Sequence, residues 1–187
     1  MIIKIAVYNI YILLFLITLL LGVLIILLIK DKIKEFFIER ISERIFAKYE
    51  ELSRDEFREW AGNLKIYNNL MDEKISSWLQ NPDTDEMAEL IVEELNLEEK
   101  WQKRAREGLW WTRALYSRRL ALIGTEASIP ILVDNLSHKN SDIFYNSALS
   151  LIKIGGKGVY NTVVNRVLNA EWLSISRAID LLSKFAD

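Results

Sequence analysis

The pattern of hydrophobic and polar positions divides the chain near residue 30. From Ile5 to Ile29 no residue is charged and nearly every side chain is apolar. A helix over this run is about 37 Å long at ~1.5 Å per residue, enough to cross a hydrocarbon core of about 30 Å with some tilt. The run is too long for the apolar core of a cleavable signal, and no small-residue cleavage site follows it. Residues 1–30 are therefore predicted to be a transmembrane anchor.

Basic residues beside this run predict its orientation. Lys4 is the only basic side chain before it, whereas Lys30, Lys32, Lys34 and Arg40 follow it closely. Basic flanks of a membrane span tend to stay on the cytoplasmic side. We therefore expect a single-pass protein of the cell membrane whose C-terminal domain is cytoplasmic. The absence of cysteine agrees with that compartment.

The next segment, residues 31–52, has one apolar stripe at helical spacing. Ile33, Phe37, Ile41 and Ile45 recur every four residues, between rows of acidic and basic side chains. This spacing predicts an amphipathic stalk helix. The stripe could pack on the domain that follows, or it could serve a coiled coil or a membrane surface. A sustained heptad needs a spacing nearer 3.5 residues, so a long coiled coil is disfavoured.

Residues 53–112 are predicted to form a helical region that packs on the C-terminal part. Ser53 followed by Glu56 is a capping-box pattern, Pro82 marks the end of a helical stretch, and Asn96 is placed to cap another helix. The chain holds only seven glycines and two prolines, and alternating β-branched runs are missing after the anchor. These features predict an all-α fold with few turns.

The C-terminal part, residues 113–187, contains an internal repeat. The sequence Leu-Ala-Leu-Ile-Gly at 120–124 recurs as Leu-Ile-Lys-Ile-Gly at 151–155, and Ala-Leu-Ser-Leu-Ile at 148–152 recurs as Ala-Ile-Asp-Leu-Leu at 178–182. A period of about 30 residues with two helices in each unit is typical of an α-solenoid. Each repeated glycine, Gly124 and Gly155, is expected to end a helix in the left-handed conformation. Pro130 is expected in the first turn of the following helix.

These residues carry a resemblance to a known family. The stretch from Arg119 to Leu136, together with Ala148 to Gly155, resembles HEAT repeats of the short bacterial type. The resemblance covers about residues 113–187. Phe144 and Tyr145 depart from it where a linking arginine is usual, and the glycine-rich residues 156–158 replace a proline-bearing helix start. It implies a short HEAT-like α-solenoid and a scaffold that binds proteins or, less often, nucleic acids, with no shared catalytic residues.

Between the acidic segment and the repeats lies the basic stretch Lys100–Arg119. It holds seven basic residues and only Glu107 against them, whereas residues 31–99 hold 19 acidic and 9 basic residues. Read as one helix, this stretch places Trp101, Ala105, Leu109, Thr112 and Tyr116 on one face, and the basic residues with Trp110 and Trp111 on the other. Tryptophan exposed among arginines is typical of an interface. Alternatively, an earlier helix covers these tryptophans and the arginines pair with the acidic segment.

We expect no enzyme activity, cofactor or metal site, because His138 is the only histidine and no nucleophile motif is present. The expected function is a membrane-anchored scaffold or adaptor for protein partners, as a monomer or in a homo- or hetero-oligomer. The alternative is that the stretch Lys100–Arg119 binds anionic lipid headgroups or nucleic acid, of which nucleic acid is the less favoured. The last helix, from Arg177 to Phe185, should leave apolar side chains exposed for association. The predicted partner-binding residues are Arg106, Trp110, Trp111, Arg113, Leu181 and Phe185.

Overall fold

The computed structural model describes residues 2–184, without the side chains of residues 2–11, 65–69 and 156–158. Within this range the chain is helical and has no strand. It divides into two compact units, residues 1–53 and residues 54–187, which are described separately. The predicted all-α class is confirmed for the part of the chain that is described.

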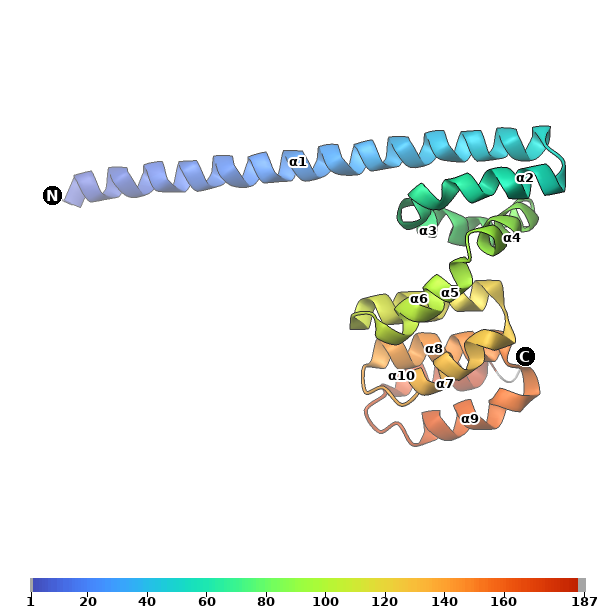
Figure 1. Cartoon of the computed structure of the whole chain (residues 1–187). Coiled ribbons are helices and arrows are strands. Elements are labelled where there is room, and N and C mark those ends of the chain that lie inside the picture. Colours follow the sequence, from blue (N-terminus) through green and yellow to red (C-terminus); the bar gives the residue numbers. More distant parts are fainter. Residues whose placement is uncertain (1, 185–187) are drawn as a thin grey trace. The chain divides into compact units, whose positions relative to one another are not determined.

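The first unit is one uninterrupted helix, α1 (Ile2–Glu51). The side chains of its apolar run from Ile12 to Ile29 are mostly exposed. By length and composition, it is the one described helix that could span a membrane (Figure 1). The hydroxyl of Thr18 in this run donates to the carbonyl oxygen of Phe15 at 2.8 Å, so this polar group is paired within the helix as a hydrocarbon environment requires.

The predicted boundary at residue 30 is a change of composition and not a break in the helix. No glycine or proline lies between Val23 and Glu51, so nothing in the sequence ends α1 there. In the charged segment, Lys32 pairs with Glu35 at 3.0 Å and Lys48 pairs with Glu51 at 2.6 Å. These one-turn pairs support the helix only modestly, because all four groups are at least partly solvated.

The second unit begins with three short helices and then continues as three helix pairs (Figure 1). The three short helices are α2 (Arg54–Ala61), α3 (Asn68–Trp78) and α4 (Asp85–Glu94), with a 3-10 helix at Gly62–Tyr67. The pairs are α5 (Leu97–Glu107) with α6 (Trp110–Ile123), α7 (Ile129–Asn135) with α8 (Ser141–Ile154), and α9 (Gly156–Leu168) with α10 (Ile175–Ser183).

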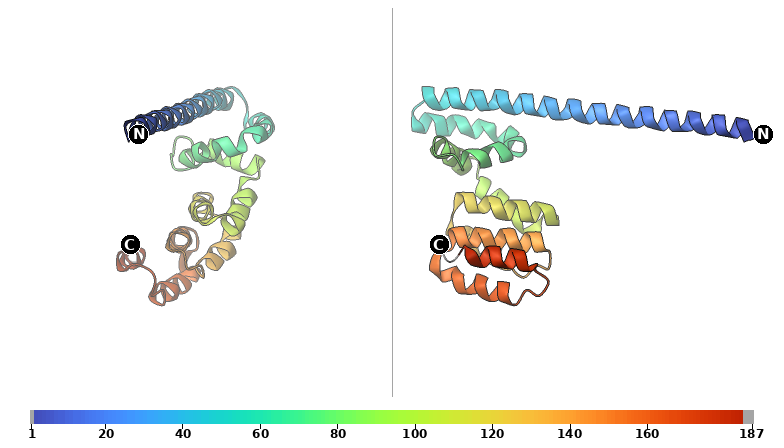
Figure 2. Two further views of the ribbon diagram at one scale, coloured as in Figure 1. Left: turned by 90° about the vertical axis from the view of Figure 1, so that its left-hand side faces the viewer. Right: turned by 180° about the vertical axis from the view of Figure 1, so that it is seen from behind.

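The pairs stack through one layer that consists of α6, α8 and α10. Helix α8 packs against both α6 and α10, and α5 lies beside α7 in a second layer. The end-on view in Figure 2 shows the two layers, and both side views show α6, α8 and α10 running in the same direction. The core between them is apolar, with fully buried Leu120, Leu132, Ile143, Ala148 and Leu151.

Several helix ends follow the sequence signals. Gly124 ends α6 with a φ of +74°, in the left-handed region that glycine adopts without strain, and Pro130 lies in the first turn of α7. Asn140 caps α8 by accepting from the amides of Asp142 and Ile143. The prediction for Gly155 is wrong: its φ is −80°, and α9 follows α8 directly.

In the region before the pairs, α2 begins at Arg54, directly after the predicted cap Ser53. Helix α2 ends at Ala61, where the chain tightens into the 3-10 helix that begins at Gly62. The predicted turn around Pro82 is present between α3 and α4. Asn96 occupies the N-cap position of α5 as expected, with a left-handed φ of 49° that asparagine tolerates. Its side chain donates to Glu99 at 2.5 Å and makes no capping bond to the helix.

Candidate functional site

The basic stretch Lys100–Arg119 is divided between two helices. Helix α5 ends at Glu107 and α6 begins at Trp110, with Gly108 as the C-cap of α5. A Cβ atom on Gly108 would lie 2.6 Å from the carbonyl oxygen of Arg104, so the close turn needs glycine. The prediction of a single helix here is wrong. Because the break changes the helical phase, Leu109 is exposed and does not share the buried face of Trp101 and Tyr116.

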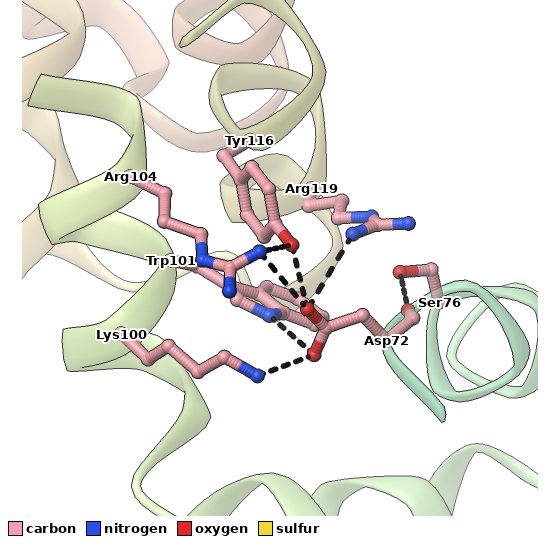
Figure 3. A network of polar contacts seen from close by, with 7 residues as sticks. All are labelled: Asp72, Ser76, Lys100, Trp101, Arg104, Tyr116 and Arg119. Carbon is pink, nitrogen blue, oxygen red and sulfur yellow. Dashed lines mark hydrogen bonds and ion pairs between the residues drawn. The ribbon is translucent and has the colours of Figure 1, made fainter. Parts of the chain in front are cut away.

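The inward side of the stretch surrounds one buried carboxylate from α3. The side chain of Asp72 is only 4% exposed. Its Oδ1 accepts from Lys100 Nζ at 2.9 Å and from Trp101 Nε1 at 3.3 Å, while its Oδ2 accepts from the Tyr116 hydroxyl at 2.6 Å (Figure 3). Both carboxylate oxygens are thus paired, as burial of a charge requires.

Two arginines complete this cluster. The nearest nitrogens of Arg104 and Arg119 both lie 3.9 Å from Asp72 Oδ2. Arg104 donates to the Tyr116 hydroxyl at 2.6 Å, and the Arg119 guanidinium lies over the Tyr116 ring, 4.8 Å from its centre (Figure 3). We define the Asp72 cluster as Asp72, Lys100, Trp101, Arg104, Tyr116 and Arg119. This cluster therefore holds α3 against α5 and α6.

The cluster favours a protonated Tyr116. Burial raises the pKa of the Tyr116 hydroxyl, and its donation to the Asp72 carboxylate raises it further, against the opposing charges of Arg119 and Arg104. The hydroxyl therefore remains a hydrogen-bond donor at neutral pH. Since each charged group of the cluster already has a partner within it, we interpret the cluster as a structural clamp between helices.

The outward side of the stretch is aromatic. Trp110 and Trp111 are each about half exposed, and their rings meet edge to face with centres 5.5 Å apart. Leu109 and Arg106 beside them are exposed too. The interpretation that an earlier helix covers these tryptophans is therefore not met by any helix of the second unit. Its second part is correct for three cations, because Lys100, Arg104 and Arg119 pair with Asp72 of the acidic segment.

Arg113 differs from the other predicted partner-binding residues. It is half-buried, and its Nη2 donates to Asn135 Oδ1 at 2.5 Å. Asn135 in turn donates to the carbonyl oxygen of Ala105 and to Ser117 Oγ, both at 3.0 Å. Arg113 thus contributes to the packing of α5, α6 and α7, and the prediction of an exposed contact residue is wrong for it.

The predicted association site on the last helix requires a correction. Leu181 is completely buried, and Phe185 lies outside the described residues. The exposed apolar side chains of α10 are instead Ile175 and Ile179. Apolar residues are present on both sides of α10, so composition alone did not show which side packs against its neighbours.

Two further polar residues, Glu98 and His138, are engaged in hydrogen bonds. Glu98 Oε1 accepts from Thr125, from Gln102 at 3.0 Å and from Ser128 at 3.2 Å, beside a shallow cavity of about 280 Å³. The Nδ1 of His138 accepts from the amide of Asn140 at 3.0 Å. Among the described residues, no group of three or more histidine, cysteine, aspartate or glutamate side chains is placed to hold a metal ion.

Comparison of the chain with protein-family models, with curated proteins and with solved structures finds no match.

Proposed function

We propose that this protein is a membrane-anchored adaptor whose helical unit presents a surface to a protein partner. The observation that carries the proposal is the apolar run of α1, whose side chains are mostly exposed over the length of a membrane span. Monomeric soluble proteins rarely expose a contiguous apolar surface of that size, and a bilayer would bury it. Basic residues at the C-terminal end of the run support a cytoplasmic second unit.

The helix pairs of the second unit support a HEAT-type array. Three pairs follow one another with a sequence period of about 30 residues, and α6, α8 and α10 form one layer. Pro130 and Gly124 lie where the resemblance expects them, at the start of α7 and the end of α6. Such arrays offer extended surfaces for binding.

The exposed side of the α6–α8–α10 layer has the chemistry of a protein interface. Leu115 and Arg118 are exposed on α6, and Ile179 is exposed on α10. Between them, Tyr145 donates to Asp180 at 2.5 Å, a bond that raises the Tyr145 pKa and lowers the Asp180 pKa. Helix α8, which carries Tyr145, packs against both α6 and α10. Apolar side chains interleaved with charged ones are typical of protein interfaces.

Nucleic acid is the less favoured partner. Phosphate binding needs several free basic side chains on one surface. In the stretch Lys100–Arg119, however, Lys100, Arg104 and Arg119 are directed toward Asp72. This arrangement leaves few cations for a phosphate backbone.

Membrane fractionation tests the anchor. The full-length protein should remain with membranes through carbonate and high-salt washes, and removal of residues 1–30 should release it. Protease added outside intact cells should spare the second unit. Recovery of the intact chain in the soluble fraction would contradict the anchor, and digestion from outside would reverse the orientation.

A matched pair of variants tests the protein surface. Affinity purification of the full chain in mild detergent should recover a partner protein. The variants Leu115→Asp and Ile179→Asp should each fail to recover that partner. Ala127→Asp, at an exposed position in the connection after α6, should retain it. If all three variants retain the partner equally, the partner binds a different surface of the protein.

A further inference from the structure

The α6–α8–α10 layer has two edges, and two of the three connections at one of them expose tryptophan. The three helices begin at the same edge, where α5 and α9 end (Figures 1 and 2). Contacts across the connections hold this edge together: Arg177 pairs with Asp142 at 2.7 Å, and the rings of Phe144 and Trp172 meet with centres 5.0 Å apart. We define the aromatic edge as residues 106–111, 136–140 and 168–175.

Large apolar side chains are exposed at two of the three connections of the aromatic edge. These two connections, residues 106–111 and 168–175, are far apart in the sequence, and the exposed fractions of the side chains range from 42% to 79%. Arg106 and Lys139 are exposed among them, as are Glu107 and Glu171. The apolar set is Leu109, Trp110, Trp111, Leu168, Trp172 and Ile175.

At the opposite edge, the connection from α6 to α7 lacks this pattern. The connection from α6 to α7 runs through residues 124–128, and in it the exposed residues are Gly124, Glu126 and Ala127. No large apolar side chain is exposed in that connection, which the structure describes completely. The connection from α6 to α7 therefore differs from the two tryptophan-bearing connections of the aromatic edge, because its exposed residues are small or acidic.

We propose that the aromatic edge lies in the headgroup region of the bilayer that holds α1. This inference rests on the anchor in the proposed function. Tryptophan is enriched at the membrane–water boundary, because its ring is apolar while its indole N–H can still bond to water or to a headgroup. Isolated basic side chains beside the rings fit the same boundary, where their long stems reach the polar layer.

The architecture of the edge favours a lipid surface over a protein groove. The six apolar side chains belong to connections and helix ends, and they do not form the continuous stripe of a single helix that a partner helix would use. In addition, α6 begins at Trp110 without a side-chain cap. Its first amides can therefore donate to water or to a headgroup oxygen.

The anchor makes even a weak contact of this kind effective. A tethered surface meets the same membrane at a high effective concentration, so each tryptophan needs to contribute little. The aromatic edge would act as a second attachment point, and it would fix which face of the helical unit points away from the lipid. The exposed side of the α6–α8–α10 layer would then have a defined orientation for its partner.

Site-specific labels on the full chain test this contact. The chain has no cysteine, so Leu109→Cys, Leu168→Cys and the control Ala127→Cys each carry one fluorescent label. The protein is reconstituted in phosphatidylcholine vesicles with a minor share of phosphatidylglycerol and of headgroup-nitroxide lipid. We expect the nitroxide to quench the labels at residues 109 and 168 several-fold more than the label at residue 127. Adding Trp110→Ser and Trp111→Ser should reduce quenching at residue 168 while the protein still floats with the vesicles.

The outcomes separate the anchor from the edge. A protein that floats with vesicles but shows equal quenching at residues 109 and 127 would overturn the edge contact and leave the anchor intact. A protein that does not float would overturn the anchor and the edge contact together. A label at residue 109 that is shielded from aqueous iodide, yet not quenched by the lipid nitroxide, would assign the edge to a contact between copies of the chain and overturn the lipid assignment.

Discussion

Trp101 and Trp111 come from one basic, aromatic stretch of sequence, yet Trp101 is completely buried and about half of Trp111 is exposed. Trp101 donates to Asp72 inside the cluster that joins α3 to α5 and α6. Trp111 lies in the first turn of the next helix, and its ring meets that of its neighbour Trp110 edge to face. Two residues of the same type, in the same local composition, thus have different surroundings and, we propose, different roles.

The difference shows how a buried charge determines which of the nearby basic side chains pack inward. Asp72 attracts the cations that can reach it, and Lys100, Arg104 and Arg119 come to it from two helices. Arg106 lies on another side of α5 and remains exposed. Packing against Asp72 therefore accounts for three of the seven basic residues of the stretch. The aromatic residues left outside are the ones that need an explanation in terms of binding.

The largest expected effect comes from removing the centre of the buried cluster. Asp72→Ala leaves three cations and the Tyr116 hydroxyl without their shared acceptor. The free energy of unfolding should fall toward the upper end of about 3–5 kcal/mol, because a buried charge left unpaired is costly. Chemical denaturation of the full chain in mild detergent, followed by circular dichroism, measures it. Asp83→Ala, at an exposed position, is the control. Equal changes in the free energy of unfolding for the two variants would contradict the interpretation of the cluster as a structural clamp.

The two tryptophans provide the most direct test of the comparison. Trp101→Ala should lower the free energy of unfolding by about 3 kcal/mol or more, through lost burial and the cavity that remains. Trp111→Ala should change it by less than about 1 kcal/mol, because half of that ring already contacts solvent. The same denaturation experiment measures both. A loss of comparable size at Trp111 would show that its ring supports the fold.

Within the Asp72 cluster, the smallest expected loss of stability concerns the Tyr116 hydroxyl. Tyr116→Phe removes a donor to Asp72 and an acceptor for Arg104, which should cost about 1–2 kcal/mol at neutral pH. Because the pKa of Tyr116 is raised in the folded protein, its contribution is complete below the unfolded tyrosine pKa of about 10 and is lost as the pH rises through the folded value. As the pH increases, the free energy of unfolding should therefore decline less steeply for the Phe variant than for the wild type. Parallel declines would show that Tyr116 does not contribute to the pH dependence.

Much of the fold can be read from the sequence because helix signals are local. The long apolar run, the scarcity of glycine and proline, Pro130 and the cap at Asn140 each act within a few residues. The errors are at single glycines. Gly108 separates α5 from α6, whereas Gly155 joins α8 to α9 in the right-handed region. A lone glycine in a helical pattern is compatible with either outcome, and neighbouring helices decide between them.

The candidate site was less accessible to sequence reasoning because its contacts are distant. Asp72 lies 28 positions before Lys100 and 44 before Tyr116, and one aspartate among 19 acidic residues carries no local signal. Pairing between the acidic and basic segments was foreseeable from their opposite charges, but the identity of the partner was not. The aromatic edge depends on which helix ends meet in the layer, and this information is contained in the packing.

The continuity of α1 has a mechanical consequence. Because the helix passes from its apolar run to Glu51 without a glycine or proline after Gly22, it has no joint where a bilayer surface would lie. The part after Ile29 is a lever about 33 Å long at ~1.5 Å per residue, so a change of about 10° in tilt displaces its end by roughly 6 Å. A membrane-spanning helix tilts more in a thinner bilayer. In a membrane, α1 would therefore convert differences in bilayer thickness into sideways displacement of Glu51.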